Sequence, residues 1–380
     1  MRKQLFLFLA IVALLVALLV YIGWAGSAYW QAILPEVPLV VYVTVYVLLA
    51  FGYMLAMLLR RVLPYRMFKL LRQVGSIGMG LLYYAILLVP LGHLAVWGLM
   101  VGGMTKTGAI VSVGTVLVVV LAVLAVIGLR NAWSPVVRRY ELTIAKRLAG
   151  RQELRVAVAS DLHLGTMVGT RHLRRLVRQV EAMKPDLILL PGDVLDDSIE
   201  PFVQERMEGV MQQLRAPLGV YAVLGNHEYI GGHVNEYVER MKAIGIEVLL
   251  DRTVELEGGL VIAGRKDYAV ERFAKSARLT VSELLDGIDR TKPIVLLDHQ
   301  PYKLDKAAEA GADIMLSGHT HRGQMMPNHL ITRRLFELDW GYVRKGSMHA
   351  LVSSGFGFWG PPMRIGSRSE LLQLDIRFTS

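Results

Sequence analysis

The first third of the chain alternates long apolar runs with short polar segments. The runs cover residues 4–23, 37–59, 74–100 and 108–129, and none contains Asp, Glu, Lys or Arg. Each reaches the roughly 20 residues needed to cross the hydrocarbon core of a bilayer. The first run could instead be a signal peptide, but it is long, lacks a small-x-small cleavage site and precedes three further runs. The pattern therefore predicts four transmembrane helices within residues 1–130.

From residue 154 the pattern changes to short β-branched and aliphatic runs that alternate with helical periodicity. Residues 171–183 place Leu173, Leu176, Val177 and Val180 on one helical face. Strands are predicted at 155–159, 187–190, 220–224, 294–297, 314–316, 351–353 and 371–376, with a hairpin at 254–263 and further helices at 203–214, 233–243 and 303–310. Alternating strands and helices followed by a strand-rich end predict an α/β domain of two packed sheets with outer helices over residues 153–380.

Residues 131–152 separate these two regions, and we interpret them as a juxtamembrane connector. The stretch 140–148 is basic and partly apolar. It predicts either a short amphipathic helix on the membrane surface or a solvated linker helix. The sequence does not choose between these two interpretations.

The charge is distributed unevenly over the chain. The formal net charge is +10, but residues 1–150 hold 13 Lys and Arg against only two acids, Glu36 and Glu141. The remainder is close to neutral, with 29 bases and 30 acids. The basic excess thus belongs to the apolar region, where it favours a membrane topology signal over a nucleic-acid footprint. We expect the lipid bilayer, and no nucleic acid, as a partner.

Lys and Arg also predict the orientation of the helices. They flank one end of the predicted bundle, whereas the segment 24–36 has none and the segment between the third and fourth runs has only Lys106. The flanking residues are Arg2, Lys3, Arg60, Arg61, Arg66, Lys69, Arg72, Arg130, Arg138, Arg139, Lys146 and Arg147. Because basic segments remain on the cytoplasmic side, both ends of the chain and residues 153–380 are predicted to be cytoplasmic.

Two features inside the third apolar run have structural interpretations. We expect His93 to be a neutral side chain that is hydrogen-bonded between helices, although an intramembrane ionisable group is also a functional candidate. The small residues Gly75, Ser76, Gly78 and Gly80 predict close helix packing.

Potential metal ligands recur where predicted strands end. Asp161 and His163 have i, i+2 spacing, as do His319 and His321, while Asp193 and Asn226 each follow a glycine. Alternation along extended backbone places i, i+2 side chains on one side. Glycine at 192 lets the backbone pass close to a neighbour. The chain has no cysteine, so the ligands must be nitrogen or oxygen atoms, which suit hard or borderline divalent cations.

The order of these motifs resembles that of the calcineurin-like metallophosphoesterases. It reads Asp161-x-His163, Gly192-Asp193, Gly225-Asn226-His227-Glu228, His299 and Gly318-His319-Thr320-His321. The resemblance covers roughly residues 153–377. The segments 317–324 and 352–364, with the four preceding apolar runs, are similar to a membrane-associated bacterial branch. The resemblance implies a two-sheet αββα sandwich and a location in the bacterial inner (plasma) membrane.

The resemblance also implies the roles of individual residues. One ion would be bound by Asp161, His163, Asp193 and His321, and a second by Asp193, Asn226, His299 and His319. His227 would lie near the phosphate as a catalytic group. The two divalent cations, Mn, Fe or Zn, would share a bridging hydroxide as the nucleophile. Arg322 is a candidate for a phosphate contact, or alternatively for a salt bridge. Glu228 and Asp196 are candidates for orienting His227 or a ligand.

The predicted function is hydrolysis of a phosphomonoester, phosphodiester or pyrophosphate by a membrane-anchored enzyme. Anchoring favours a lipid-linked or membrane-proximal substrate. Two alternatives remain open. One is a UDP-diacylglucosamine-type pyrophosphate hydrolase, and the other is a non-catalytic membrane scaffold or sensor that uses the same fold.

Overall fold

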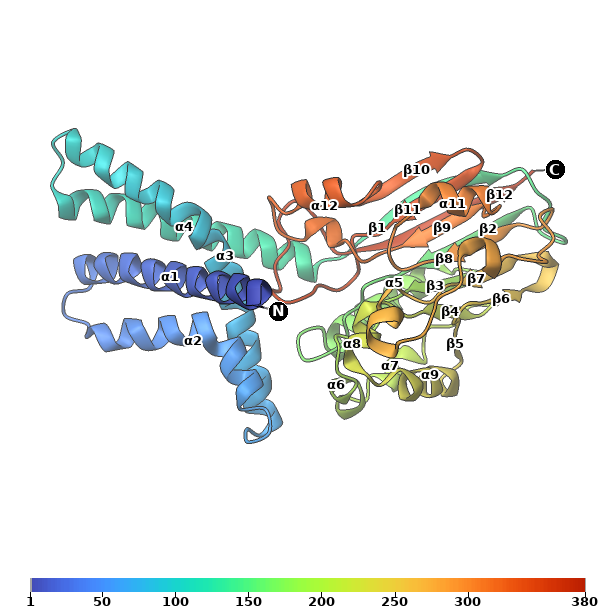
Figure 1. Cartoon of the computed structure of the whole chain (residues 1–380), viewed down its shortest axis with the longest axis horizontal. Helices are drawn as coiled ribbons and strands as arrows, with labels where there is room; N and C mark the ends of the chain where they lie inside the picture. Colours follow the sequence, from blue (N-terminus) through green and yellow to red (C-terminus); the bar gives the residue numbers. More distant parts are fainter. Residues whose placement is uncertain (1, 380) are drawn as a thin grey trace. The chain divides into compact units, whose positions relative to one another are not determined.

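The computed structural model describes residues 2–379 and divides into two compact units. The first unit comprises residues 1–129 and 360–363, and the second comprises residues 130–359 and 364–380. The first contains long helices, and the second contains all the strands that the structure describes (Figure 1). This agrees with the switch from long apolar runs to short alternating elements in the sequence.

The first unit is built from four helices that follow one another with short turns. They are α1 (Arg2–Ile33), α2 (Leu39–Leu58), α3 (Tyr65–Val101) and α4 (Lys106–Trp133). All four are long and apolar enough to cross a membrane. Large apolar side chains such as Leu14 and Val126 remain exposed on them, as expected of surfaces that face lipid.

Two helices extend beyond the predicted runs. The helix α3 begins at Tyr65, nine residues before the predicted run starts at residue 74. This added segment includes Arg66, Lys69 and Arg72, whose side chains favour a helix but whose charges keep the segment out of the hydrocarbon core. Its 37 residues correspond to about 55 Å, well over the bilayer core. The helix α1 likewise continues from residue 23 to Ile33. Hydropathy marks the part of a helix that fits in lipid, whereas backbone hydrogen bonding continues past it.

Small residues bring α2 and α3 close together. A Cβ atom added at Gly75 would lie 1.9 Å from the backbone nitrogen of Tyr53, and one at Gly78 would lie 2.0 Å from the carbonyl oxygen of Leu49. The prediction that these glycines serve helix packing is confirmed. His93 is also an interhelical residue, since its Nδ1 lies 2.5 Å from the Tyr21 hydroxyl on α1.

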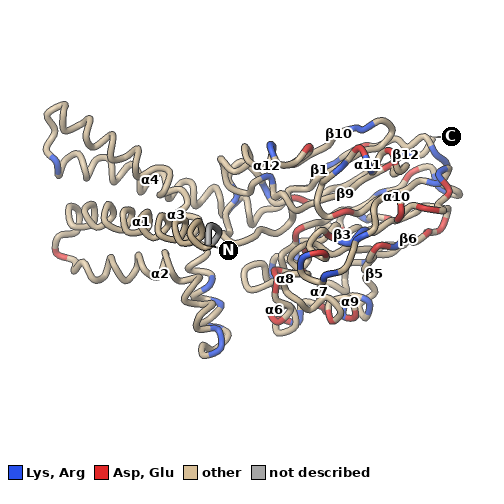
Figure 2. The backbone as a smooth tube through the Cα atoms, viewed as in Figure 1, with Lys and Arg blue, Asp and Glu red and all other residues tan. Residues whose placement is uncertain are grey.

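Most basic residues in the first unit lie at and after the turn between α2 and α3. Figure 2 shows basic residues around the turn between α2 and α3, where Arg60, Arg61 and Arg66 lie. The turn between α1 and α2 carries Glu36, and α4 begins at Lys106. The asymmetry used to predict the orientation is thus present in the folded helices.

The second unit contains two six-stranded sheets. The first sheet has the order β1-β12-β2-β3-β4-β5, and the second has the order β10-β11-β9-β8-β7-β6. The strands are β1 (Val136–Ile144), β2 (Glu153–Val158), β3 (Leu187–Pro191), β4 (Val220–Val223), β5 (Ile246–Val248), β6 (Arg252–Glu255), β7 (Val261–Gly264), β8 (Ile294–Leu297), β9 (Ile314–Ser317), β10 (Gly341–Lys345), β11 (Met348–Val352) and β12 (Glu370–Phe378). The strands β6 and β7 form the predicted antiparallel hairpin.

The sheets pack face to face, and helices cover their outer faces (Figure 1). Val156 and Leu189 of the first sheet share one apolar core with Ile262 and Leu316 of the second. The first sheet is covered by α5 (Thr170–Met183), α7 (Glu208–Met211) and α9 (Val234–Ala243), and the second by α10 (Val281–Leu284) and α11 (Leu304–Glu309). Short helices α6 (Glu200–Gln204), α8 (Asn226–Gly231) and α12 (His329–Leu335) occupy loops. The predicted αββα sandwich is confirmed.

The prediction of a helix in the connector is wrong, because residues 136–144 form the edge strand β1. This strand pairs in parallel with β12 along its whole length, from Val136 opposite Glu370 to Ile144 opposite Phe378. Its side chains alternate between exposed and covered positions, and Leu142 and Ile144 are buried in the core between the sheets. Pairing with a strand more than 200 residues away outweighs the local helical propensity.

Candidate metal centre

The predicted ligands lie in five loops that follow parallel strands. The strands β2, β3 and β4 are neighbours in the first sheet, and β8 and β9 are neighbours in the second. Since parallel strands end at the same edge of their sheet, the loops after them meet there. The backbone ties the first two loops together, because the N–H of Asp161 donates to the carbonyl of Gly192 and that of His163 donates to Asp193.

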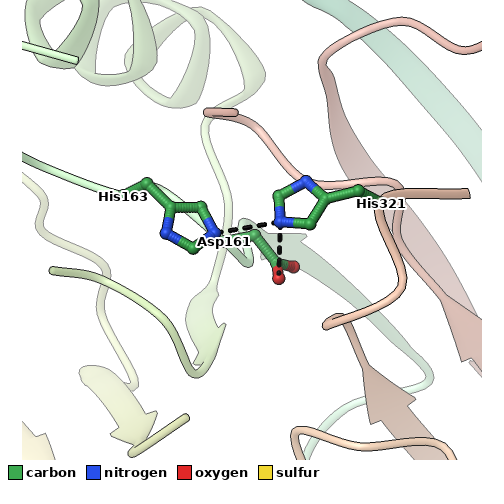
Figure 3. A group of neighbouring side chains, drawn as sticks. All are labelled: Asp161, His163 and His321. Atoms are coloured by element: carbon green, nitrogen blue, oxygen red, sulfur yellow. Dashed lines mark hydrogen bonds and ion pairs between the residues drawn. The ribbon is translucent and has the colours of Figure 1, made fainter. Parts of the chain in front are cut away.

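The first group of candidate ligands consists of Asp161, His163 and His321. Figure 3 shows the two imidazole rings pointing toward each other beside the carboxylate. The Nε2 atoms of His163 and His321 are 2.9 Å apart, and Nε2 of His321 is 3.5 Å from Oδ1 of Asp161. All three side chains are buried. Two ligand atoms with bonds of about 2.1 Å to one octahedral ion lie about 3 Å apart, so these distances fit a shared cation.

The second group consists of Asp193, Asn226, His299 and His319. Nε2 of His299 is 3.0 Å from Oδ2 of Asp193, and Nδ1 of His319 is 2.8 Å from Oδ1 of Asn226. Asp193, His299 and His319 also offer ligand atoms within 4.8 Å of one another. The structure thus brings together all seven predicted ligands in two adjacent groups.

Asp193 connects the two groups through one oxygen atom. Its Oδ2 faces His299 at 3.0 Å and His163 at 3.9 Å. Its Oδ1 is occupied differently, because it accepts a hydrogen bond of 2.9 Å from the backbone N–H of His227. Any sharing of Asp193 between two ions would therefore pass through Oδ2.

The protonation of the imidazoles suits cation binding. Nδ1 of His299 donates to the carbonyl oxygen of Pro191, which leaves Nε2 as the atom that faces Asp193. Burial alone would lower the pKa of His299, but the nearby Asp193 carboxylate raises this pKa well above its ordinary value. The carboxylate therefore stabilises a positive charge beside it, either on a protonated imidazole or on a cation. Nε2 nevertheless has no hydrogen-bond partner among residues 2–379. A bound cation would take Nε2 of His299 and Oδ2 of Asp193 as ligand atoms.

Two other histidines are kept neutral, the form in which imidazole binds metal. Burial lowers the pKa of His319 to about 4. Burial, with the neighbouring His163 and Arg364, lowers the pKa of His321 well below its usual value. These residues fit a cation site of nitrogen and oxygen donors.

The backbone at the candidate ligands is held in an uncommon conformation. Asp161, His163, Asp193, His319 and His321 all have positive φ, between 47° and 70°. Non-glycine residues in this region carry strain that persists only where the surroundings impose it, and such residues cluster at functional sites. Five of the seven candidates therefore have left-handed backbone, and the extended backbone predicted for the two i, i+2 pairs is wrong.

Glycines of the motifs make room for the ligands. A Cβ atom at Gly192 would lie 2.6 Å from Nδ1 of His299, and φ at Gly192 is +88°. A Cβ at Gly225 would lie 2.0 Å from Oδ1 of Asp193. The expectation that the backbone at residue 192 passes close to a neighbour is confirmed, and that neighbour is a candidate ligand.

His227 lies beside the first group and is oriented by Asp197. Its Nδ1 is 2.7 Å from Oδ1 of Asp197, and its ring packs edge-on against His163 at 4.7 Å between centroids. Burial lowers the pKa of His227, but the carboxylates of Asp193 and Asp197 outweigh it and raise the pKa to about 9. The structure assigns the orienting contact to Asp197, which the sequence interpretation overlooked in favour of Glu228 and Asp196.

Glu228 instead fastens two ligand loops together. Its carboxylate accepts hydrogen bonds from the backbone N–H groups of Asp193 at 3.2 Å, Leu195 at 2.8 Å and Gly225 at 2.7 Å. The loops after β3 and β4 thus share one buried acceptor. Of the two roles predicted for Glu228, orienting His227 or orienting a ligand, its contacts agree with the second, because one of its hydrogen bonds comes from the backbone of the candidate ligand Asp193.

Replacing Glu228 should loosen both loops. We expect Glu228→Ala to destabilise the folded domain by about 3 kcal/mol, because it leaves three buried backbone donors without their shared acceptor. The melting temperature of the full chain, followed by tryptophan fluorescence in detergent, should fall by about 6 °C or more. Glu228→Gln keeps one acceptor oxygen, so its melting temperature should lie between those of the native chain and Glu228→Ala. An unchanged melting temperature in Glu228→Ala would refute the role.

Comparison with known proteins identifies the fold family. The family model of calcineurin-like phosphoesterases matches residues 154–323. An uncharacterized metallophosphoesterase of Aquifex aeolicus is 32% identical over 63% of this chain and 91% of its own length. The chain belongs to the calcineurin-like phosphoesterase family.

Relatives of this chain also include proteins described as transmembrane. A transmembrane protein with metallophosphoesterase domain from Bos taurus is 31% identical over 74% of this chain. The chain spans 66% of that relative's length and 61% of that of a Danio rerio relative with the same description. Among solved structures, the chain is similar to an NAD nucleotidase of Haemophilus influenzae, with a TM-score of 0.35, 16% identity and coverage of 53% of this chain and 46% of that one. With four helices that are long and apolar enough to cross a membrane, and with transmembrane relatives, the chain is a membrane protein.

Two arginines of the phosphoesterase unit lie near the candidate ligands. The guanidinium of Arg322 lies 4.0 Å from the ring centre of Trp340, a cation–π contact in place of the salt bridge that was the alternative. Arg364 is fully buried, donates to the carbonyls of Ser354 and Gly357, and lies 3.0 Å from Nδ1 of His321. Arg364 was not a sequence candidate, because its place beside His321 depends on a 43-residue separation.

Proposed function

We propose that the chain is a membrane-anchored phosphoesterase with a dinuclear metal centre. Residues 1–130 would form the membrane region, and residues 153–380 would form the catalytic domain, to which β1 adds an edge strand. The observation that carries the proposal is the position of Asp193, whose Oδ2 faces one candidate ligand in each of the two groups. A carboxylate between two sets of nitrogen and oxygen donors suits two neighbouring cations, which it can hold together.

We assign the first ion to Asp161, His163, Asp193 and His321. The second ion is assigned to Asp193, Asn226, His299 and His319. When bound, two such divalent cations, Mn, Fe or Zn, would activate a water molecule and neutralise charge on a phosphoryl group. The neutral imidazoles supply ligand atoms without adding negative charge, so the site stays attractive to a phosphate.

His227 is proposed as the catalytic group that contacts the phosphoryl oxygen or the leaving oxygen. Its hydrogen bond to Asp197 holds Nδ1, which leaves Nε2 as the atom that can donate a proton. The raised pKa keeps that proton on the ring at neutral pH. Arg322 is proposed as a further phosphate contact, with its guanidinium oriented by Trp340.

The substrate is proposed to be a lipid-linked or membrane-proximal phosphoester. The reason is the four apolar helices, which keep the catalytic domain close to a bilayer. Purified full chain should hydrolyse bis(p-nitrophenyl) phosphate or p-nitrophenyl phosphate with added Mn or Zn and lose this activity in EDTA. It should also prefer phosphatidic acid or a lipid pyrophosphate in mixed micelles over soluble nucleotides. Preference for nucleotides over every amphiphile would contradict the substrate class, and inactivity with all metals would contradict the hydrolase.

The catalytic domain is proposed to face the cytoplasm, since the basic residues lie at the ends and at the turn between α2 and α3. The chain has no cysteine, so Asp305→Cys on α11 would introduce a unique thiol on a well-exposed side chain. A membrane-impermeant maleimide should label it only after the cells are permeabilised. Equal labelling in intact cells would place the domain outside.

A further inference from the structure

The helix α12 exposes an unusually apolar surface beside the candidate metal centre. Among the exposed large apolar side chains described for the second unit, Leu335 (64% exposed), Ile331 (58%) and Leu330 (57%) have the highest exposure, followed by Trp359 (55%). Three of these four belong to one seven-residue helix. A cluster of exposed apolar side chains is typical of a surface that binds a partner or a membrane, whereas single exposed apolar side chains are common on soluble domains.

The fold fixes this surface in its outward orientation. Within α12, the hydroxyl of Thr332 donates to the Asp339 carboxylate at 2.7 Å. The residue that ends the helix, Phe336, is buried with its ring 5.8 Å from that of His319. The apolar side chains of α12 thus cannot turn inward without breaking contacts next to a candidate ligand.

Trp359 belongs to the same rim. Its backbone N–H and carbonyl are both hydrogen-bonded to the side-chain amide of Gln324, at 3.1 and 2.8 Å. Gln324 follows η3 (His321–Gly323) and comes five residues before α12 begins. The indole also lies 6.1 Å from the ring of His227. We define the apolar rim as Leu330, Ile331, Leu335 and Trp359, and its Trp359 lies next to His227.

Positive charge accompanies the apolar rim. Arg333 and Arg334 are exposed on α12, and residues 326–336 contain no acid. Figure 2 shows these basic residues on the α12 segment. Exposed leucine, isoleucine and tryptophan with adjacent arginines are typical of helices that lie in the interface of an anionic bilayer. A soluble protein partner would not require this combination, and this chain is already a membrane protein.

We propose that the apolar rim docks into the interfacial layer of an anionic phospholipid bilayer. Leu330, Ile331 and Leu335 would enter the acyl-chain boundary, Trp359 would lie at headgroup level, and Arg333 and Arg334 would contact lipid phosphates. This contact goes beyond the proposed function and does not depend on hydrolysis. It would bring His227 and the metal centre to the depth at which lipid phosphates lie.

The test uses the full chain in vesicles, with single cysteines carrying the fluorophore NBD. Ile331→Cys and Leu335→Cys report on the rim, and Phe273→Cys, an exposed apolar position on η2 (Val270–Ala274), is the matched control. With phosphatidylcholine and phosphatidylglycerol at about 7:3, doxyl-labelled acyl chains should quench the rim probes at least about threefold more than the control. Equal quenching at all three positions would overturn the proposal.

A second measurement tests the role of charge and the rival occupant. Arg333→Gln with Arg334→Gln, placed in the Ile331→Cys chain, should lower the quenching in anionic vesicles to the level seen with phosphatidylcholine alone. Quenching that the two replacements leave unchanged would overturn the assignment of lipid phosphates to these arginines. Formation of a disulfide-linked dimer by Leu335→Cys, without quenching, would overturn the proposal in favour of a second copy of the chain.

Discussion

Asp193→Asn should lower kcat/KM for phosphoester hydrolysis by about 1,000-fold or more, because both proposed ions lose their shared anionic ligand. The amide can keep the Oδ1 contact with the backbone N–H of His227, so the loop after β3 retains its local hydrogen bond. What disappears is the negative charge at the position of Oδ2, between His163 and His299. Steady-state kinetics with saturating Mn measures the effect.

Metal analysis and a control variant separate this loss from misfolding. Asp193→Asn should bind fewer ions per chain than the native protein, with a melting temperature that still indicates a folded domain. Asp289→Asn changes an exposed aspartate in a turn and should leave both activity and metal content unchanged. Native activity in Asp193→Asn would exclude a shared carboxylate from the mechanism.

His227→Asn should reduce kcat by about 100- to 1,000-fold, the range expected on losing a positioned proton donor. Unlike Asp193, His227 is not assigned to an ion, so the metal content should stay at the native level. The loss should be smaller for substrates with p-nitrophenolate leaving groups, which need no proton, than for alkyl phosphoesters. This difference between leaving groups distinguishes a proton donor from a residue that only shapes the pocket.

Asp197→Asn provides the companion measurement. It removes the charge that orients His227 and helps to raise its pKa, and it should cost about tenfold in kcat. A loss of bound metal in His227→Asn would instead indicate a structural role next to His163. Equal losses for both leaving groups would also argue against proton donation.

The ligand positions were predictable because local sequence and sheet geometry agree there. Each motif follows a short strand of four to six mostly buried residues, and parallel strands bring their ends to one edge. The resemblance to a known family then grouped the residues into two sets. The role of Gly192 was also predictable, because a glycine in a strand-end motif already indicates that the backbone there has no room for a Cβ atom.

The parts that escaped prediction depend on contacts between distant segments. β1 alternates apolar and polar side chains from Arg139 to Ile144, but Lys146 and Arg147 made the stretch 140–148 resemble a basic helix. The partner of β1, β12, follows more than 200 residues later in the sequence. Arg364 reaches His321 through a loop whose path no periodicity reveals. Asp197 was overlooked in favour of Asp196, because only the folded turn shows which neighbouring carboxylate meets the imidazole.

The most direct test of the dinuclear centre is the metal content of the purified full chain. After loading with Mn or Zn and removal of loosely bound ions, mass spectrometry of the metals should find two ions per chain, and Asn226→Ala should retain one. Two ions in the native protein and one in that variant are the results that the account predicts. A native protein that binds one ion, or none, while it hydrolyses phosphoesters would contradict it.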